Sequence, residues 1–243
     1  MIGYDGHGTI PKADGVESFW LYVERVYGRR SLARFLCQGL LLTAFSSFPT
    51  VVGSVLRGYV YRFFLGGIGK KCFLEKNIRF FNSAKLFLGD RVFVGAGAFF
   101  DAGPEASAIE IGTDSHIARN VTMRIHEGKI EIGEKVNIGA DSFIYGYGDI
   151  RIGDYCLVAN QVEIISGTHD YQDVDTPMRF QGRTPSEIVI GEDVWLGTHA
   201  VVLGGVTIGK GAIIGAGSVV HRDIPEYGIA VGIPARVIKS RKD

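Results

Sequence analysis

The fold of this chain is decided by residues 188–220, which read IVIGEDVWLGTHAVVLGGVTIGKGAIIGAGSVV. An aliphatic residue followed at once by Gly returns here at multiples of six residues, as at Ile190-Gly191, Leu196-Gly197, Ile208-Gly209 and Ile214-Gly215. Hexapeptide repetition of this kind predicts a parallel β-helix. Each aliphatic side chain then points inward and stacks on its equivalents in the neighbouring coils, while the small residue keeps a Cβ out of the corner.

The same pair recurs upstream. The earlier copies are Leu88-Gly89, Val94-Gly95, Ile111-Gly112, Ile117-Ala118, Ile132-Gly133, Ile138-Gly139, Ile152-Gly153 and Val158-Ala159. Three hexapeptides make one triangular coil, so equivalent positions return after about 18 residues. The step from Ile190 to Ile208 is 18 residues, but the step from Ile152 to Ile190 is 38, so one coil ejects a loop of about twenty residues. This loop, at 170–187, is long for a compact repeat, and such loops are usually functional.

Composition narrows the class of protein. Lys plus Arg and Asp plus Glu both number 26, so the formal charge is zero and no basic excess indicates a nucleic-acid partner. Three scattered cysteines fit a reducing compartment better than a disulfide framework. The first 15 residues lack the pattern of a secretory signal, so we expect a cytoplasmic protein.

The chain before the repeat has a different pattern. We predict a helical region over 1–70, the β-helix over 71–228 and a C-terminal tail over 229–243. The stretch from Phe35 to Leu56 carries no charge and is flanked by arginines such as Arg57. Its length could span a bilayer, but the Ser-Ser-Phe-Pro segment ending at Pro49 should break it into two short helices.

Two interpretations of this helical region stay open. It is either a cap packed over the first coil or an interfacial anchor. The anchor would hold residues 35–65 on a membrane surface, with the protein peripheral on the cytoplasmic face of the inner membrane. A transmembrane span is disfavoured, because polar residues lower the hydrophobicity of the stretch.

His169 is the strongest candidate for chemistry among the six histidines. It stands where a coil opens into the ejected loop, a position that faces a groove rather than bulk water. Imidazole titrates near neutral pH and can therefore serve as a general base. Asp170 and Asp173 either orient this imidazole or are ordinary loop acids. For His116 and His126 we expect solvent-exposed imidazoles.

The spacing of a zinc site is absent around His169, which has no other His within five residues and no Cys nearby. We therefore expect no metal. A Gly-x-Ser-x-Gly elbow and a Gly-rich phosphate loop are also missing, because the glycines follow the corner period instead.

Residues 188–220, together with Asp223-Ile-Pro-Glu-Tyr and Val231-Gly-Ile-Pro-Ala-Arg-Val-Ile, resemble the hexapeptide-repeat acyltransferases. The similarity is strongest to the galactoside, maltose and polysaccharide O-acetyltransferase branch. The resemblance implies an all-β, left-handed parallel β-helix of hexapeptide-repeat coils, with an α-helical N-terminal region and one long ejected loop. The left hand comes from the resemblance alone, since parallel crossovers are otherwise right-handed.

The resemblance also implies acetyl-CoA as donor, a homotrimer, and active sites in clefts between adjacent subunits. The family's catalytic histidine falls on His169, and its oxyanion donor falls on the amide of Thr198. Contacts to the donor fall on Trp195, Gly197, Thr198, Ala216, His221, Arg222, Arg236 and Lys239. Relatives often carry Thr-Lys where this chain has His221-Arg222.

The predicted function is therefore transfer of an acetyl group from acetyl-CoA to a sugar hydroxyl in a cell-surface polysaccharide or its precursor. Two alternatives stay open. One is an N-acetyltransferase that acts on a nucleotide-linked amino sugar. The other is a non-catalytic β-helix scaffold, which would have no need of His169 or Trp195.

Overall fold

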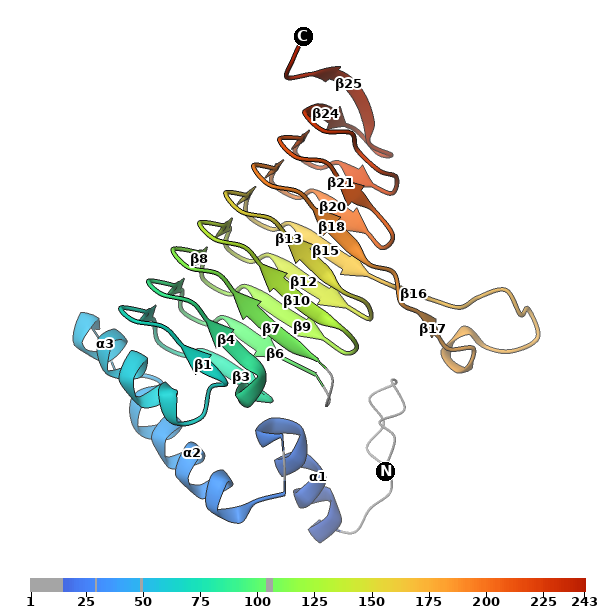
Figure 1. Cartoon of the computed structure of the whole chain (residues 1–243). Helices are drawn as coiled ribbons and strands as arrows, with labels where there is room; N and C mark the ends of the chain where they lie inside the picture. The colour runs from blue at the N-terminus through green and yellow to red at the C-terminus, as the bar shows by residue number, and fades with distance from the viewer. Residues whose placement is uncertain (1–14, 29, 49, 104–106) are drawn as a thin grey trace.

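The structure is a computed structural model that describes residues 15–28, 30–48, 50–103 and 107–243. Its repeat region is a left-handed parallel β-helix with three faces, seen as a tapering stack of coils in Figure 1. The helical N-terminal region lies at one end of the stack, and the C-terminal strand lies at the other. The predicted fold class is confirmed.

Each face of the prism is one sheet, and we call the sheets faces A, B and C. Face A has seven strands: β1 (Gly67–Ile68), β4 (Leu86–Leu88), β7 (Ala108–Ile111), β10 (Lys129–Ile132), β13 (Ile150–Ile152), β18 (Ile188–Ile190) and β21 (Thr207–Ile208). Strand β1 lies within the range that the sequence assigned to the helical region.

Faces B and C complete the coils. Face B has nine strands: β2 (Phe73–Leu74), β5 (Phe93–Val94), β8 (His116–Ile117), β11 (Asn137–Ile138), β14 (Leu157–Val158), β19 (Trp195–Leu196), β22 (Ile213–Ile214), β24 (Gly228–Val231) and β25 (Arg236–Ser240). Face C has seven strands: β3 (Arg79–Phe81), β6 (Phe99–Asp101), β9 (Thr122–Ile125), β12 (Phe143–Gly146), β15 (Glu163–Ser166), β20 (Val201–Leu203) and β23 (Val219–Val220).

The aliphatic residue of each hexapeptide pair fills the core, as predicted. Ile117 and Ile138 are fully buried and lie directly opposite each other on paired strands. Burying such a side chain stabilises the fold by roughly 1.5–3 kcal/mol. The small residue after it is needed for coil stacking, since a Cβ on Gly112 would lie 2.5 Å from the carbonyl carbon of Gly133. The left-handed backbone of the corner comes two residues later, at Asp114 (φ 61°).

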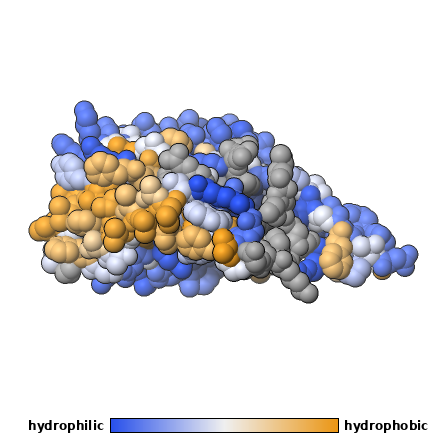
Figure 2. Space-filling view, turned by 90° about the horizontal axis from the view of Figure 1, so that it is seen from below, coloured by the Kyte–Doolittle hydropathy of each residue, from blue (hydrophilic) through white to orange (hydrophobic). Residues whose placement is uncertain are grey.

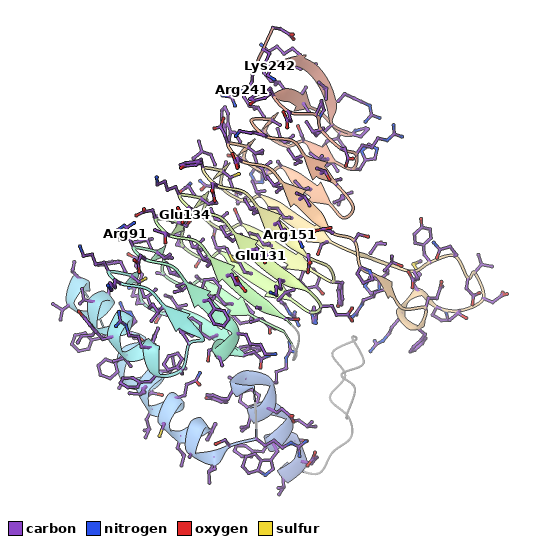
Figure 3. The ribbon with its side chains drawn as sticks, in the orientation of Figure 1. Arg91, Glu131, Glu134, Arg151, Arg241 and Lys242 are labelled. Carbon is purple, nitrogen blue, oxygen red and sulfur yellow. The ribbon has the colours of Figure 1, made fainter. Side chains whose placement is uncertain are left out.

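Charged side chains on the outside pair from one coil to the next. Arg91 Nε lies 2.6 Å from Asp114 Oδ1, and Arg151 Nε lies 2.9 Å from Glu131 Oε2 (Figure 3). These pairs are half exposed, so each contributes little to stability.

The predicted loop leaves face C after β15 and projects away from the prism (Figure 1). Its base is a two-stranded antiparallel ribbon of β16 (Thr168–His169) and β17 (Arg183–Thr184), and one 3₁₀ turn, η3 (Met178–Phe180), lies near its tip. The chain then rejoins the stack at β18.

The N-terminal region forms three helices, α1 (Gly15–Tyr27), α2 (Leu32–Phe45) and α3 (Thr50–Val60), followed by the 3₁₀ turn η1 (Tyr61–Phe63). A further turn, η2 (Ser83–Lys85), precedes β4. The predicted break of the uncharged stretch into two helices is confirmed. None of the helices in the described ranges is long and apolar enough to cross a membrane.

Arg57 ties these helices to the first coil. Its guanidinium is buried and donates to the carbonyl oxygens of Phe45 (2.9 Å), Phe48 (2.9 Å) and Leu74 (2.8 Å). Burial lowers the pKa of this guanidinium. The sequence treated Arg57 as a charge flanking an apolar stretch, but it donates to carbonyls at and just after the end of α2, where the helical hydrogen-bond pattern stops.

Candidate active site

Two corners of the prism carry the residues singled out from the sequence. We call the corner between faces C and A the CA corner, and the corner between faces B and C the BC corner. His169 lies at the CA corner, at the base of the ejected loop, and its side chain is exposed. In the antiparallel ribbon it lies directly opposite Arg183. Opposed side chains on such a pair lie about 5 Å apart on one face, so Arg183 is the nearest cross-strand neighbour of His169.

The acidic residues of the loop bond within the loop. Asp170 Oδ1 accepts a 2.6 Å hydrogen bond from the Thr184 hydroxyl. Asp173 Oδ1 accepts from the amides of Asp175 (2.9 Å) and Thr176 (3.3 Å). These carboxylates therefore organise the ribbon and the turn beyond it.

The BC corner holds Thr198 and Ala216 in successive coils, with the Gly217 amide donating to the Thr198 carbonyl at 2.9 Å. Lower in the same column, Asn160 Oδ1 caps the amide of Ala140 at 2.9 Å. The residue placed to cap the Thr198 amide in this way is Ala216, whose methyl group cannot accept a hydrogen bond. Among the described residues, the Thr198 amide therefore lacks the side-chain cap that Asn160 gives Ala140.

A row of outward-facing residues next to this corner runs from strand to strand across face B. Trp195 is paired with Ile213, Ile213 with Ile229, and Ile229 with Lys239 on the antiparallel edge strand β25. The Trp195 side chain is 51% exposed, and Lys239 is exposed. With strands about 4.8 Å apart, the row spans roughly 14 Å from an aromatic ring to a cation. Arg236 lies opposite Val231 on the same edge.

The predicted set is therefore divided between the two corners. Trp195, Gly197, Thr198, Ala216, Arg236 and Lys239 lie on face B or at the BC corner, whereas His169, His221 and Arg222 lie at the CA corner. Thr198 precedes β20, and His169 follows β15. These two strands are neighbours on face C. The two residues are thus separated within one protomer by the width of face C, roughly 15 Å at about 3.3 Å per extended residue.

Sequence reasoning missed a polar cluster at the CA corner beneath the loop, made of Arg124, His126, Tyr145, Tyr147 and Arg183. The His126 ring stacks on Tyr147 at 4.8 Å, and the Tyr145 and Tyr147 hydroxyls are 3.0 Å apart. The Arg183 guanidinium lies over the Tyr147 ring at 4.4 Å. The cluster thus reaches the residue opposite His169.

The expectation of a solvent-exposed imidazole at His126 is wrong. The ring is partly buried, and burial together with the charges of Arg124, Arg25 and Arg183 lowers its pKa to about 4. Burial and the hydrogen bond with Tyr145 raise the pKa of Tyr147. Coil spacing could have predicted the contact between His126 and Tyr147. His126, Tyr147 and Gly167 follow one another at steps of 21 and 20 residues, about one coil each. His116 is exposed as expected and stacks on Phe93 at 4.4 Å.

Among the residues that the structure describes, no group of three or more His, Cys, Asp or Glu side chains is arranged to hold a metal ion.

Comparisons with known proteins agree with this architecture. Residues 187–222 match the bacterial transferase hexapeptide (six repeats) family model, and residues 129–164 match a model for the hexapeptide repeat of succinyl-transferase. The Escherichia coli acetyltransferase WcaF, named for colanic acid biosynthesis, is 34% identical over 130 residues, which are 51% of this chain and 69% of WcaF. The chain belongs to the hexapeptide-repeat acetyltransferase family. The predicted family is thereby confirmed.

Other members of the hexapeptide-repeat family extend the comparison. A Mycobacterium tuberculosis protein named as an acetyltransferase, Rv3034c, is 43% identical over 151 residues, which are 62% of this chain and 50% of that protein. This chain thus spans half the length of that relative. The structure of AntD, an N-acyltransferase from Bacillus cereus in complex with dTDP and coenzyme A, has a TM-score of 0.56 at 20% identity and covers 81% of this chain and 91% of its own. That similarity concerns the fold.

Proposed function

We propose that this protein is an acetyl-CoA-dependent O-acetyltransferase that acetylates a sugar hydroxyl of a cell-surface polysaccharide or its precursor. The observation that carries the proposal is the exposed imidazole of His169 at the base of the ejected loop, in a chain of the acetyltransferase family. The link of WcaF to colanic acid favours a polysaccharide acceptor.

His169 acts as the general base. One imidazole nitrogen takes the proton of the acceptor hydroxyl as its oxygen attacks the thioester carbonyl carbon. The Thr198 amide donates to the oxyanion that develops. When the C–S bond breaks, the imidazolium returns the proton to the departing sulfur, so the products are the acetyl ester and free CoA.

The donor lies along the row on face B. Its pantetheine arm packs against Trp195 and Ile213, and its phosphates meet Lys239 and Arg236 at the edge strand. The extended row, with a ring at one end and cations at the other, supports this assignment. Arg222 supplies a further cation from the CA corner, with His221 beside it.

The working site is formed between protomers of a homotrimer. His169 and Thr198 are separated by the width of face C in one chain, so one protomer alone does not bring base and oxyanion donor together. Two neighbouring prisms do so when the CA corner of one lies against the BC corner of the next.

Transfer is tested with the purified full chain, acetyl-CoA and matched hydroxyl and amino sugars, with products read by mass spectrometry. We expect acetyl esters, which mild alkali removes. Alkali-stable amides would instead support N-acetylation of an amino sugar, the second candidate, which the nucleotide in the AntD structure favours. A protein that acetylates neither acceptor and gains no thermal stability from CoA would contradict the enzyme assignment, because a ligand that binds the folded state stabilises it.

The helical end of the prism docks on an anionic membrane surface. Figure 2 shows a broad apolar area on this end. On α2 and α3 the most exposed apolar side chains include Leu40 (69%) and Val51 (66%), and Phe63 follows at 82%. Besides the buried Arg57, the sequence from Ser31 to Leu74 contains four Arg or Lys residues and no Asp or Glu. An apolar face in a positively charged segment suits the interface of an anionic bilayer.

Vesicle sedimentation tests this docking. Binding to vesicles that contain phosphatidylglycerol should exceed binding to pure phosphatidylcholine vesicles, and should weaken in high salt. The double variant Leu36→Glu, Leu40→Glu should lose binding. The matched control Val174→Glu, at a 92% exposed loop position, should retain it. Equal binding to both kinds of vesicle, or to the double variant, would contradict the proposal.

A further inference from the structure

The ribbon that carries His169 leaves the prism at Gly167. This residue lies between β15 and β16 with φ 98°, a backbone conformation that a side chain would strain. A Cβ on Gly167 would lie 3.0 Å from the Cβ of Tyr147 and 3.1 Å from the carbonyl oxygen of Thr184. The outgoing strand, the returning strand and the preceding coil therefore meet at this point, two residues before His169.

The backbone of Tyr147 is held by the coils of the prism. Its amide donates to the Ser166 carbonyl at 2.8 Å. The fully buried Ser166 donates its hydroxyl proton to the Gly148 carbonyl at 2.7 Å and accepts from the Gly148 amide at 3.2 Å. The position of Tyr147 is therefore set by buried hydrogen bonds between coils rather than by the ribbon.

The ring of Tyr147 has partners on the prism and on the ribbon. His126 stacks on the ring at 4.8 Å with an angle of 4° between the planes, and the Tyr145 hydroxyl lies 3.0 Å from the Tyr147 hydroxyl. The Arg183 guanidinium lies over the same ring, 4.4 Å from its centre. Tyr147 is 9% exposed, and a cation over a desolvated ring is held more strongly than a cation at an exposed site.

The ribbon itself is a short pairing of two strands that projects from the prism (Figure 1). Thr168 pairs with Thr184, and His169 pairs with Arg183. A two-stranded ribbon is marginally stable without further support, so contacts with the prism must fix its direction. Tyr147 contributes such contacts to both strands, at Gly167 before the outgoing strand and at Arg183 on the returning strand.

We propose that Tyr147 is the positioning residue for the catalytic base, because its ring is fixed on the prism and sets the direction of the ribbon that carries His169. The inference rests on the proposed function, in which His169 is the base. Tyr147 acts on the reaction through Gly167 and Arg183 rather than on a substrate. A displacement of about 1 Å at a reacting group can lower a rate about a hundredfold, so the effect is large enough to measure.

Substitutions at Tyr147 separate the ring from its hydroxyl. Tyr147→Leu keeps an apolar side chain at this buried position but removes the aromatic face, so kcat should fall by roughly ten- to a hundredfold. KM for acetyl-CoA should stay unchanged, because the proposed donor row lies on face B. Tyr147→Phe keeps the ring and should restore kcat to the wild-type value. A role in stability alone would lower the melting temperature and leave the kcat of the folded protein unchanged.

Tyr155→Leu is the matched control. Tyr155 also lies beneath a cation, with Lys135 Nζ 5.2 Å from the ring centre, but at the corner between faces A and B. This variant should keep the wild-type kcat. If Tyr147→Leu turns over normally in a protein that His169→Ala inactivates, the positioning role is refuted and the general base stands. Equal losses in the Leu and Phe variants of Tyr147 would also contradict the proposal, because the hydroxyl rather than the ring would then matter.

Amide hydrogen exchange tests the positioning role without turnover. The Asp170 amide donates to the Gly182 carbonyl at 3.2 Å across the ribbon, so its exchange reports opening of the two strands. In Tyr147→Leu, peptides from 167–184 should exchange several times faster than in wild type, while peptides from 188–203 in the next coil keep their rates. Tyr147→Phe should show wild-type exchange throughout. Unchanged exchange of the ribbon in Tyr147→Leu would overturn the inference even if no acceptor were acetylated.

Discussion

The two corners of face C use opposite means to present chemistry. The CA corner gathers large side chains from successive coils, so that His126, Tyr147 and Arg183 stack in one column beside His169. At the BC corner the corresponding residues are small, namely Gly197, Thr198 and Ala216. One corner therefore offers side-chain acids and bases, and the other offers backbone donors.

The difference shows how a repeat can become a site. Most corners after faces A and B share one backbone plan, with a small residue for stacking and a left-handed residue two positions later. Chemistry enters where one column departs from the common pattern. At the CA corner the departure is the ejected ribbon, and at the BC corner it is the loss of a cap such as the one that Asn160 gives Ala140.

The largest expected effect comes from the CA corner. His169→Ala should lower kcat by about 10²- to 10⁴-fold, because proton transfer loses its base. Affinity for CoA, measured by calorimetry, should be unchanged, since the donor row lies on another face. His116→Ala, at an exposed histidine on face B, is the matched control and should keep full activity. Normal turnover by the His169 variant would remove the base assignment.

The BC corner is tested by restoring the missing cap. Ala216→Asp should place a carboxylate on the Thr198 amide, as Asn160 lies on Ala140. Loss of one oxyanion donor should reduce kcat by roughly 10²- to 10³-fold. Ala140→Asp introduces the same side chain lower in the same column, and should leave kcat and thermal stability unchanged. Wild-type kcat in the Ala216 variant would show that the Thr198 amide takes no part.

Mixing the two variants tests whether the corners meet between subunits. In trimers assembled at random from His169→Ala and Ala216→Asp chains, about a quarter of the interfaces pair an intact CA corner with an intact BC corner. Activity should therefore recover to roughly that fraction of wild type, although each variant alone is inactive. If co-expressed chains form mixed trimers and stay inactive, the two corners act within one protomer.

Sequence pattern was sufficient for the parts of the molecule that depend on local spacing. The hexapeptide phase predicted the buried aliphatic columns, and the gap from Ile152 to Ile190 predicted the ejected loop. Pro49 predicted the break between α2 and α3. In each case a short stretch of chain carries the whole signal.

Contacts between distant residues were not predicted, because their signal is spread over several coils. His126 becomes partly buried through Tyr147, 21 residues on, and through Arg183 from the returning strand of the loop. Arg57 has the composition of a solvent-facing flank, yet it is buried among carbonyl groups of α2 and β2. Both residues are polar, so their residue type predicted exposure to solvent. Their contacts with distant residues bury them instead.

The smallest expected effect is a pH dependence of stability at the CA corner. The folded pKa of His126 is about 4, below the ordinary value of 6.5 for a histidine. Between these values the unfolded chain binds a proton that the folded chain does not, so stability falls as the pH is lowered from about 6.5 to 4. His126→Phe keeps an aromatic ring on Tyr147 and removes this proton.

Melting curves at pH 7 and pH 4.5 measure the effect. Both proteins should lose stability in acid through their carboxylates, but wild type should lose more than His126→Phe. The partial exposure of the ring limits the difference to a few °C, at roughly 2–4 °C per kcal/mol for a chain of this size. His116→Phe removes an exposed imidazole and should retain the wild-type pH dependence. If wild type and His126→Phe respond to acid identically, burial and the neighbouring arginines do not hold His126 neutral.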